Sequence, residues 1–216
     1  MKENKKSWED RSEKYSNNIK GVLYKSFPDS LNNHFHNRDK TFLLDNIPNN
    51  SNLRILDLGC GYGRNSMVLL DRNKDIEIVG VDISENYIIQ FKENTAQKGI
   101  SSSLEDLPDT VGKFNYIICV ATFMYVECQN QEQILKKIFS FLEDSGKIIF
   151  IEPFSSGQKF INGFGLLNKF NSKRKTTGGH FLNFNDLSIK ILKAQGEIIS
   201  VKRIPITTIF IFNNFQ

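Results

Sequence analysis

The stretch ILDLGCGYGRNS, residues 55–66, carries the strongest indication of the fold. A short apolar run leads into three closely spaced glycines, Gly59, Gly61 and Gly63, and a segment of helical pattern follows. Glycine lacks a side chain, so a turn built from it lets another group approach the backbone closely. After a parallel strand, such a turn brings backbone N–H groups and a helix N-terminus to the sheet edge where open α/β sheets bind ligands. A tight turn that binds nothing remains the alternative for the glycines alone.

An acid downstream of the glycines adds a second indication of a binding site. Asp82 ends the apolar run IEIVGVD, roughly twenty residues on, where a carboxylate can accept hydrogen bonds from both hydroxyls of a ribose. The glycines follow G-x-G-x-G spacing, which differs from the G-x-G-x-x-G of dinucleotide-binding proteins. Asp57, just before the turn, predicts either a cap that holds the N–H groups of the loop or a contact with a cationic amine.

Strand-like runs alternate with amphipathic segments from residue 53 onward, which predicts βαβ units and a mostly parallel sheet. Ser84 is the predicted N-cap of one helix, and Gly99 its predicted end. Past Pro153 the composition shifts to Gly, Asn, Ser and aromatic residues, which predicts an insertion. Strands are expected at 53–59, 76–82, 100–103, 114–123, 146–153, 197–206 and 207–216, and the last two are expected to pair antiparallel. Helices are expected in the first fifty residues and at 65–72, 84–99, 130–144 and 185–196.

The composition indicates one globular domain and argues against several classes of protein. The chain has 216 residues, 39% of them hydrophobic, and a formal net charge of +4, too dispersed to indicate nucleic-acid binding. The polar start lacks the pattern of a secretory signal, and the longest apolar run, 116–126, is far shorter than the ~20 residues of a membrane helix. Cys60, Cys119 and Cys128 form no cluster, so we expect a reducing cytoplasm and no metal site.

Five stretches in the right order resemble the motifs of class I S-adenosylmethionine-dependent methyltransferases, of the small-molecule type related to ubiquinone and menaquinone methyltransferases. They are ILDLGCGYGRNS, VGVDIS, SSSLEDLP, FNYIICVATFMYV and LEDSGKIIFIEP. The resemblance implies a Rossmann-like, doubly wound seven-stranded sheet, mostly parallel, with an antiparallel C-terminal strand. It also implies a single methyltransferase domain over residues 1–216. This domain divides into a helical cover (1–50), a cofactor-binding core (51–153), a lid insertion (154–182) and a closing helix with strands (183–216).

The resemblance further implies S-adenosylmethionine as cofactor and S-adenosylhomocysteine as product. The methionyl part would lie over the glycine turn, Asp82 would hold the ribose, and residues 104–105 would close the adenine pocket. The stretch SWEDRSEKY resembles the N-terminal helix that related enzymes fold over the cofactor, so Trp8 and Tyr15 are candidates to cover it. The expected cofactor-binding residues are Tyr15, Asp57, Gly59, Cys60, Gly61, Gly63, Asp82, Ile83, Leu104, Glu105 and Val120.

Methyl transfer from a sulfonium depends mainly on holding donor and acceptor in line, and a base is needed only when the acceptor carries a proton of high pKa. The candidate catalytic residues are Tyr125, Glu152 and His180. Tyr125 follows the fourth strand where ubiquinone- and menaquinone-type enzymes often place His, and His180 lies within the insertion. Glu152 stands at the end of the fifth strand, but it could equally cap a turn.

The acceptor is expected to be a small molecule, methylated on oxygen or nitrogen in preference to carbon. No NPPY-like run follows the fourth strand, which argues against the amino-methyltransferases of nucleic-acid bases and glutamine. The Phe-rich insertion suits a partly apolar acceptor, although its aromatics could form their own small core. We expect no nucleic acid and no membrane partner, and a homodimer is left open. An RNA or protein-terminus methyltransferase and a non-catalytic cofactor-binding regulatory subunit are the alternatives.

Overall fold

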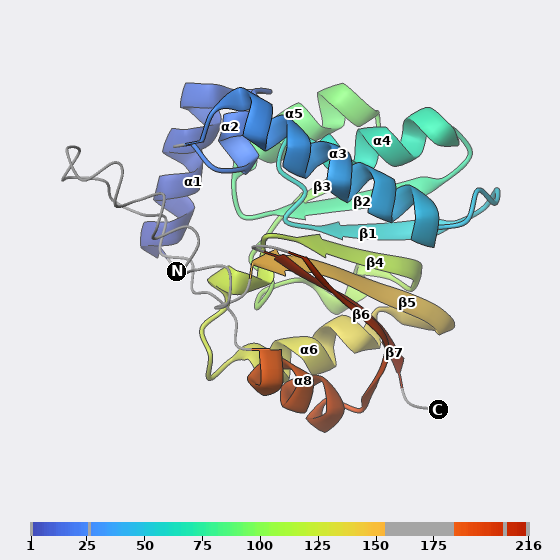
Figure 1. The fold of residues 1–216 in the computed structure, drawn as a ribbon. Helices are drawn as coiled ribbons and strands as arrows, with labels where there is room; N and C mark the ends of the chain where they lie inside the picture. Colours follow the sequence, from blue (N-terminus) through green and yellow to red (C-terminus); the bar gives the residue numbers. More distant parts are fainter. Residues whose placement is uncertain (1, 26, 154–183, 205–206, 215–216) are drawn as a thin grey trace. The chain divides into compact units, whose positions relative to one another are not determined.

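A computed structural model describes residues 2–25, 27–153, 184–204 and 207–214 (Figure 1). The predicted insertion, with His180, lies outside these residues. Three helices come first, α1 (Lys2–Tyr15), α2 (Ile19–Val22) and α3 (Asp29–Asn46). The helical pattern predicted for this part of the sequence is therefore confirmed.

Seven strands form one sheet in the order β3-β2-β1-β4-β5-β7-β6. β1 pairs parallel with β2, and β2 pairs parallel with β3, whereas β7 pairs antiparallel with both β5 and β6. The predicted Rossmann-like fold, with its antiparallel C-terminal pair, is confirmed. The strands are β1 (Arg54–Leu58), β2 (Glu77–Asp82), β3 (Lys98–Ser101), β4 (Phe114–Val120), β5 (Leu142–Pro153), β6 (Gly196–Ile204) and β7 (Thr207–Asn214).

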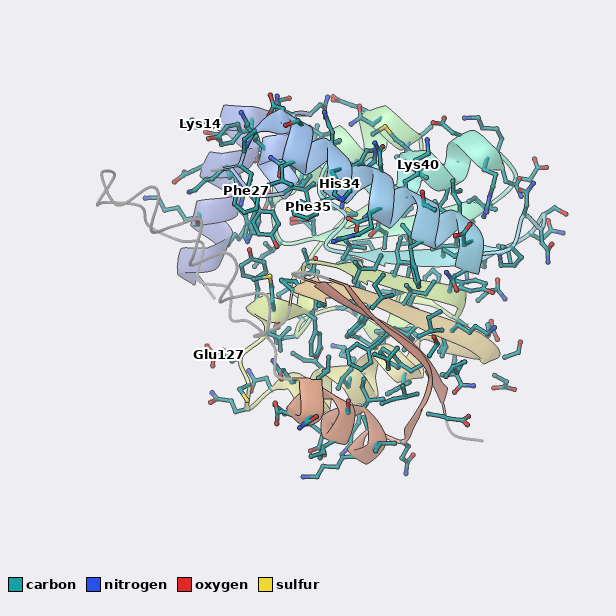
Figure 2. The ribbon with its side chains drawn as sticks, viewed as in Figure 1. Lys14, Phe27, His34, Phe35, Lys40 and Glu127 are labelled. Carbon is teal, nitrogen blue, oxygen red and sulfur yellow. The ribbon has the colours of Figure 1, made fainter. Side chains whose placement is uncertain are left out.

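The chain divides into two compact units, of which the first comprises residues 1–108 and 114–116. It holds β1 to β3 together with α4 (Arg64–Arg72) and α5 (Glu85–Thr95). In this unit α1 packs against α5, and α3 packs against α4. Phe27 and Phe35, labelled in Figure 2, lie with ring centroids 6.2 Å apart, and Tyr24 lies 4.8 Å from Phe27. This aromatic cluster anchors the start of α3.

The second unit comprises residues 109–113 and 117–216. In the part of this unit that the structure describes, its strands are accompanied by the 3-10 turns η1 (Asp109–Val111) and η2 (Phe123–Tyr125) and by the helices α6 (Gln131–Ser140) and α8 (Phe184–Lys193). Phe150 of β5 packs between Phe123 and Phe212, with ring centroids 5.1 and 5.0 Å away. These buried rings form the centre of the core of this unit.

Several predicted boundaries are wrong. The strand predicted at 100–103 spans Lys98–Ser101, the strand predicted at 114–123 ends at Val120, and the helix predicted at 185–196 ends at Lys193, so that Gly196 already lies in β6. α5 begins after its predicted cap, Ser84, but it ends at Thr95, and Ala96 rather than Gly99 takes the left-handed conformation that closes it, with φ of 55°. Gly99 lies in β3 and pairs with Gly80 of β2. A Cβ on Gly99 would lie 3.0 Å from a methyl group of Ile88 on α5. The glycine therefore serves close packing between helix and sheet.

Another wrong boundary is the end of the helix predicted at 130–144. α6 ends at Ser140, and β5 already begins at Leu142, four residues ahead of the predicted strand. Leu142 is 1% exposed, so burial of its side chain extends the strand toward the helix.

Within the described residues, none of the helices combines the length and the apolar composition that crossing a membrane requires.

Candidate functional site

The glycine turn after β1 is locked to the end of β2. Gly59, Gly61 and Gly63 have φ values of 74°, 53° and 94°, which only glycine adopts without strain. The N–H groups of Gly59 and Cys60 both donate to the carbonyl of Val81, at 2.7 and 3.0 Å, and the N–H of Gly63 donates to Cys60. These N–H groups were expected to face a ligand. They are instead used by the turn itself.

Protein side chains fill the space that two of the glycines leave. A Cβ on Gly61 would lie 2.5 Å from Cγ1 of Val22, at the end of α2, and a Cβ on Gly63 would lie 2.9 Å from Cγ2 of Thr95. Cβ atoms essentially never approach other heavy atoms this closely. The close approach predicted from the sequence is real, but at these two positions the approaching groups come from α2 and α5.

Asp82 joins the end of β2 to the glycine turn. Its carboxylate accepts the N–H of Gly61 and the N–H of Ser84, each at 2.9 Å, and the residue stays partly exposed. Burial of the carboxyl group raises its pKa to about 6, while the N–H bonds from Ser84 and Gly61 act in the opposite direction. The two features that the sequence paired, the glycines and the acid, are thus in direct contact.

Asp57 lies at the end of β1 with 1% of its surface exposed. Its carboxylate accepts the hydroxyl of Ser66 at 2.7 Å. Burial raises the pKa of Asp57 to about 6, although the Ser66 bond and the nearby Arg64 lower it. The structure thus assigns Asp57 to a buried bond between β1 and α4. Ser66 was not singled out from the sequence, although it closes the quoted stretch GRNS.

The N-terminus of α4 carries two further residues that the sequence did not single out. Arg64 is 6% exposed and donates to Nδ1 of His36 at 3.0 Å and to Asp39 at 3.2 Å, both on α3. Because arginine can only donate, Nδ1 of His36 is the acceptor and the ring is neutral. Asn65 is 7% exposed, and among the described residues its Oδ1 atom has no hydrogen-bond partner. Such an orphaned buried oxygen is suited to a donor from outside the chain.

α1 reaches the N-terminus of α5 through Glu9. The Glu9 carboxylate accepts the hydroxyl of Ser84 and the N–H of Glu85, both at 2.7 Å, directly after Asp82 and Ile83. A negative charge at this end of a helix is stabilising. Glu9 lies in the stretch SWEDRSEKY, from which Trp8 and Tyr15 were singled out for the cover. Glu9, the acid directly after Trp8, thus contributes to the contacts between α1 and α5, together with the ion pair of Lys5 with Glu85 at 2.8 Å.

The remaining predicted cofactor residues of this unit lie close in sequence to these elements. Trp8 and Tyr15 are half-buried on α1, and basic side chains stack on their rings. The N–H of Ser102, just past β3, donates to the backbone carbonyl of Asp82 at 2.9 Å, which ties the segment leading to residues 104–105 to the end of β2. The other predicted residues are Cys60 and Leu104, which are buried, and Ile83 and Glu105, which are half-buried.

The second unit holds Val120, Tyr125 and Glu152. Val120 ends β4 with 9% of its surface exposed, and Tyr125 is half-buried in η2. Glu152 is 0% exposed, and its carboxylate accepts three consecutive backbone N–H groups, those of residues 122–124. Burial raises its pKa to about 7. Of the two roles that the sequence left open for Glu152, the structure shows the cap on a turn.

Residues 49–186 match the model of the family described as Methyltransferase domain. The uncharacterized protein RP789 of Rickettsia prowazekii is 31% identical to this chain over 122 residues, which are 53% of this chain and 22% of that protein. The chain spans between about a fifth and three fifths of the length of the first curated relatives it matches.

Solved structures of methyltransferases share the fold. A Leishmania major S-adenosylmethionine-dependent methyltransferase matches with a TM-score of 0.72 at 16% identity, over 97% of this chain and 83% of that chain. The magnesium protoporphyrin IX methyltransferase of Synechocystis PCC 6803, solved with bound S-adenosylmethionine, matches with a TM-score of 0.67 at 14% identity, over 98% and 97% of the two chains. At such identities the likeness is one of fold.

Proposed function

Because this chain belongs to the methyltransferase domain family, we propose that it binds S-adenosylmethionine and transfers the methyl group to a small-molecule acceptor, on oxygen or nitrogen. The observation that carries the proposal is the bond of 2.9 Å between the Gly61 N–H and the Asp82 carboxylate. It brings the glycine turn and the acid at the end of β2 into one place. Open α/β sheets bind nucleosides with a glycine turn and an acid placed in this way.

The residues present fit the cofactor in two respects. A carboxylate offers about four acceptor positions, so the partly exposed Asp82 keeps capacity for a ribose hydroxyl beyond its bonds to Gly61 and Ser84. The orphaned Oδ1 of Asn65, at the start of α4, is an acceptor that an amino group such as that of a methionyl moiety would satisfy. Asp57, bonded to Ser66 and buried, would act through the turn without contact to the cofactor.

When bound, the cofactor supplies an electrophilic methyl group on a sulfonium sulfur. The contribution of the chain is to hold donor and acceptor in line and to exclude water, and such positioning can be worth effective molarities of about 10⁵ to 10⁸ M. Tyr125 remains the proposed side chain on the acceptor side, and His180 lies outside the described residues. Both carboxylate oxygens of Glu152 accept backbone N–H groups, so we assign this residue no proton transfer with the acceptor.

A small-molecule acceptor is supported by the sequence and by one solved relative. The segment after β4 lacks the motif of base-directed amino-methyltransferases. The Synechocystis enzyme that shares the fold is named for a porphyrin substrate. We further propose that the chain acts in the cytoplasm, because its cysteines form no cluster typical of a disulfide framework.

Titration calorimetry with S-adenosylmethionine and S-adenosylhomocysteine tests the proposal. Asp82→Ala is expected to weaken binding of both by about 1 to 3 kcal/mol, because it removes a partly buried acceptor for ribose hydroxyls. The matched control is Asp75→Ala, an exposed acid just ahead of β2, which is expected to leave the affinity unchanged.

A folded wild-type sample that binds neither compound at millimolar concentration would refute the proposed cofactor. Binding without turnover across a panel of hydroxyl and amine acceptors would instead favour a regulatory subunit. Equal affinity in Asp82→Ala and in the wild type would show that the ribose is held elsewhere.

A further inference from the structure

The turn after β4 is built around the buried carboxylate of Glu152. Oε1 accepts the N–H groups of Thr122 and Phe123 at 2.9 and 2.8 Å, and Oε2 accepts the N–H of Met124 at 3.3 Å. Successive backbone N–H groups that converge in this way form a concavity for an anion. Here the anion belongs to the chain itself, from the end of the neighbouring strand in the sheet, β5.

The backbone of this turn needs such support. Ala121, the first residue past β4, has φ of 53°, a left-handed conformation that costs a residue with a side chain about 1 to 3 kcal/mol. Its N–H donates to the carbonyl of Ile151 at 2.9 Å. Two consecutive residues of β5, Ile151 and Glu152, therefore fix the chain where it leaves β4. η2, which carries Tyr125, follows immediately.

We propose that Glu152 is a positioning residue, which holds η2 and Tyr125 in the backbone conformation that receives the methyl acceptor. The inference rests on the proposed function in one respect, namely that this turn meets an acceptor. Strained backbone supported from outside is typical of functional turns, because the support fixes a geometry that the chain would not otherwise keep.

The charge of Glu152 sets how firmly the turn is held. As a carboxylate it accepts all three N–H groups, whereas the protonated acid gives up acceptor capacity to its own proton. Because burial raises the pKa of Glu152 to about 7, both forms are populated near neutral pH. Among the described residues, the groups bonded to the Glu152 carboxylate are Cys119 on β4, with Sγ 3.5 Å from Oε1, and the uncharged backbone N–H groups of residues 122–124. Its register partner on β7 is the uncharged Thr208.

Amide hydrogen exchange of the full chain tests the proposal. In the wild type, the protection factor of Met124 is expected to rise as the pH passes upward through the pKa of Glu152. In Glu152→Gln the side-chain amide presents donors in place of one carboxylate oxygen, so Met124 is expected to lose about tenfold or more of its protection and to keep no pH dependence. Strand amides of β5 and β7, such as Phe150 and Phe210, are expected to stay unchanged.

Glu143→Gln is the matched control, because Glu143 lies on the same strand but is exposed. It is expected to behave as the wild type. Unchanged protection of Met124 in Glu152→Gln, or an equal loss at Met124, Phe150 and Phe210, would overturn the proposal, since the latter reports general destabilisation. If Glu152→Gln does not fold, the protection factor of the Met124 amide in the wild type, measured as a function of pH, decides the question. A protection factor that does not change with pH would overturn the proposal.

Kinetics provide the second readout. With an acceptor that the wild type methylates, Glu152→Gln is expected to lower kcat about tenfold or more while its affinity for S-adenosylhomocysteine stays unchanged. An unchanged kcat would overturn the acceptor-side role. Should the wild type methylate nothing while the exchange results hold, the proposed function fails and the assignment of Glu152 as the support of this turn stands.

Discussion

At the scale of single residues, the glycines of the β1 turn are required by conformation and by internal packing. Gly61 has φ of 53°, and a Cβ there would lie 2.5 Å from Val22. Gly61→Ala is therefore expected to lower the free energy of unfolding by about 2 to 3 kcal/mol, from a strained backbone and a clash with a stiff, branched side chain. Urea denaturation followed by circular dichroism measures this change.

A double-mutant cycle separates the two contributions. Val22→Ala removes the clashing methyl group but leaves the left-handed backbone, so the double variant is expected to lose about 1 kcal/mol less than the sum of the two single variants. Strict additivity would show that α2 does not pack on the turn in solution.

At the scale of elements, the contacts of α1 with the start of α5 include the Glu9 carboxylate and the ion pair of Lys5 with Glu85. Glu9 bonds to Ser84 and to the N–H of Glu85 at 2.7 Å. Glu9→Ala is expected to cost about 1 kcal/mol of stability and to increase hydrogen exchange in α1, because the helix loses one of its charged contacts with α5. Exchange measured by mass spectrometry on peptides from α1 checks this, with the exposed Asp10→Ala as control. Equal exchange in the two variants would assign the anchoring to other contacts of α1.

At the scale of the whole molecule, Asp57, Asp82 and Glu152 are carboxyl groups whose pKa burial raises, to about 6, 6 and 7. Each keeps its proton in the folded state at a pH where the unfolded chain has lost it. These three groups therefore make stability fall as pH rises from about 4 to about 7, and the effect is constant above that range. His36 acts in the opposite direction, because burial and Arg64 lower its pKa.

Asp57→Asn isolates one of these contributions. A shift from 3.8 to about 6 corresponds to roughly 3 kcal/mol. Relative to Asp57→Asn, the wild type is expected to lose up to about this much stability between pH ~4 and ~6, with no further change at higher pH. Urea midpoints across that range at constant ionic strength measure the difference. A difference that does not vary with pH would show that Asp57 ionises with an ordinary pKa.

The sequence by itself determined the succession of strands and helices along the chain, the antiparallel closing pair and the family. These features follow from hydrophobic periodicity, from Ser84 as a helix cap and from the spacing between the glycines and Asp82, all of which can be recognised in short segments of the chain. Only the tertiary structure decided which groups these segments meet. The contacts of Val22 with Gly61, of Glu9 with Ser84 and of Glu152 with the turn after β4 join residues far apart in the chain. Such contacts follow from how elements pack, and no local pattern encodes the partner of a buried carboxylate.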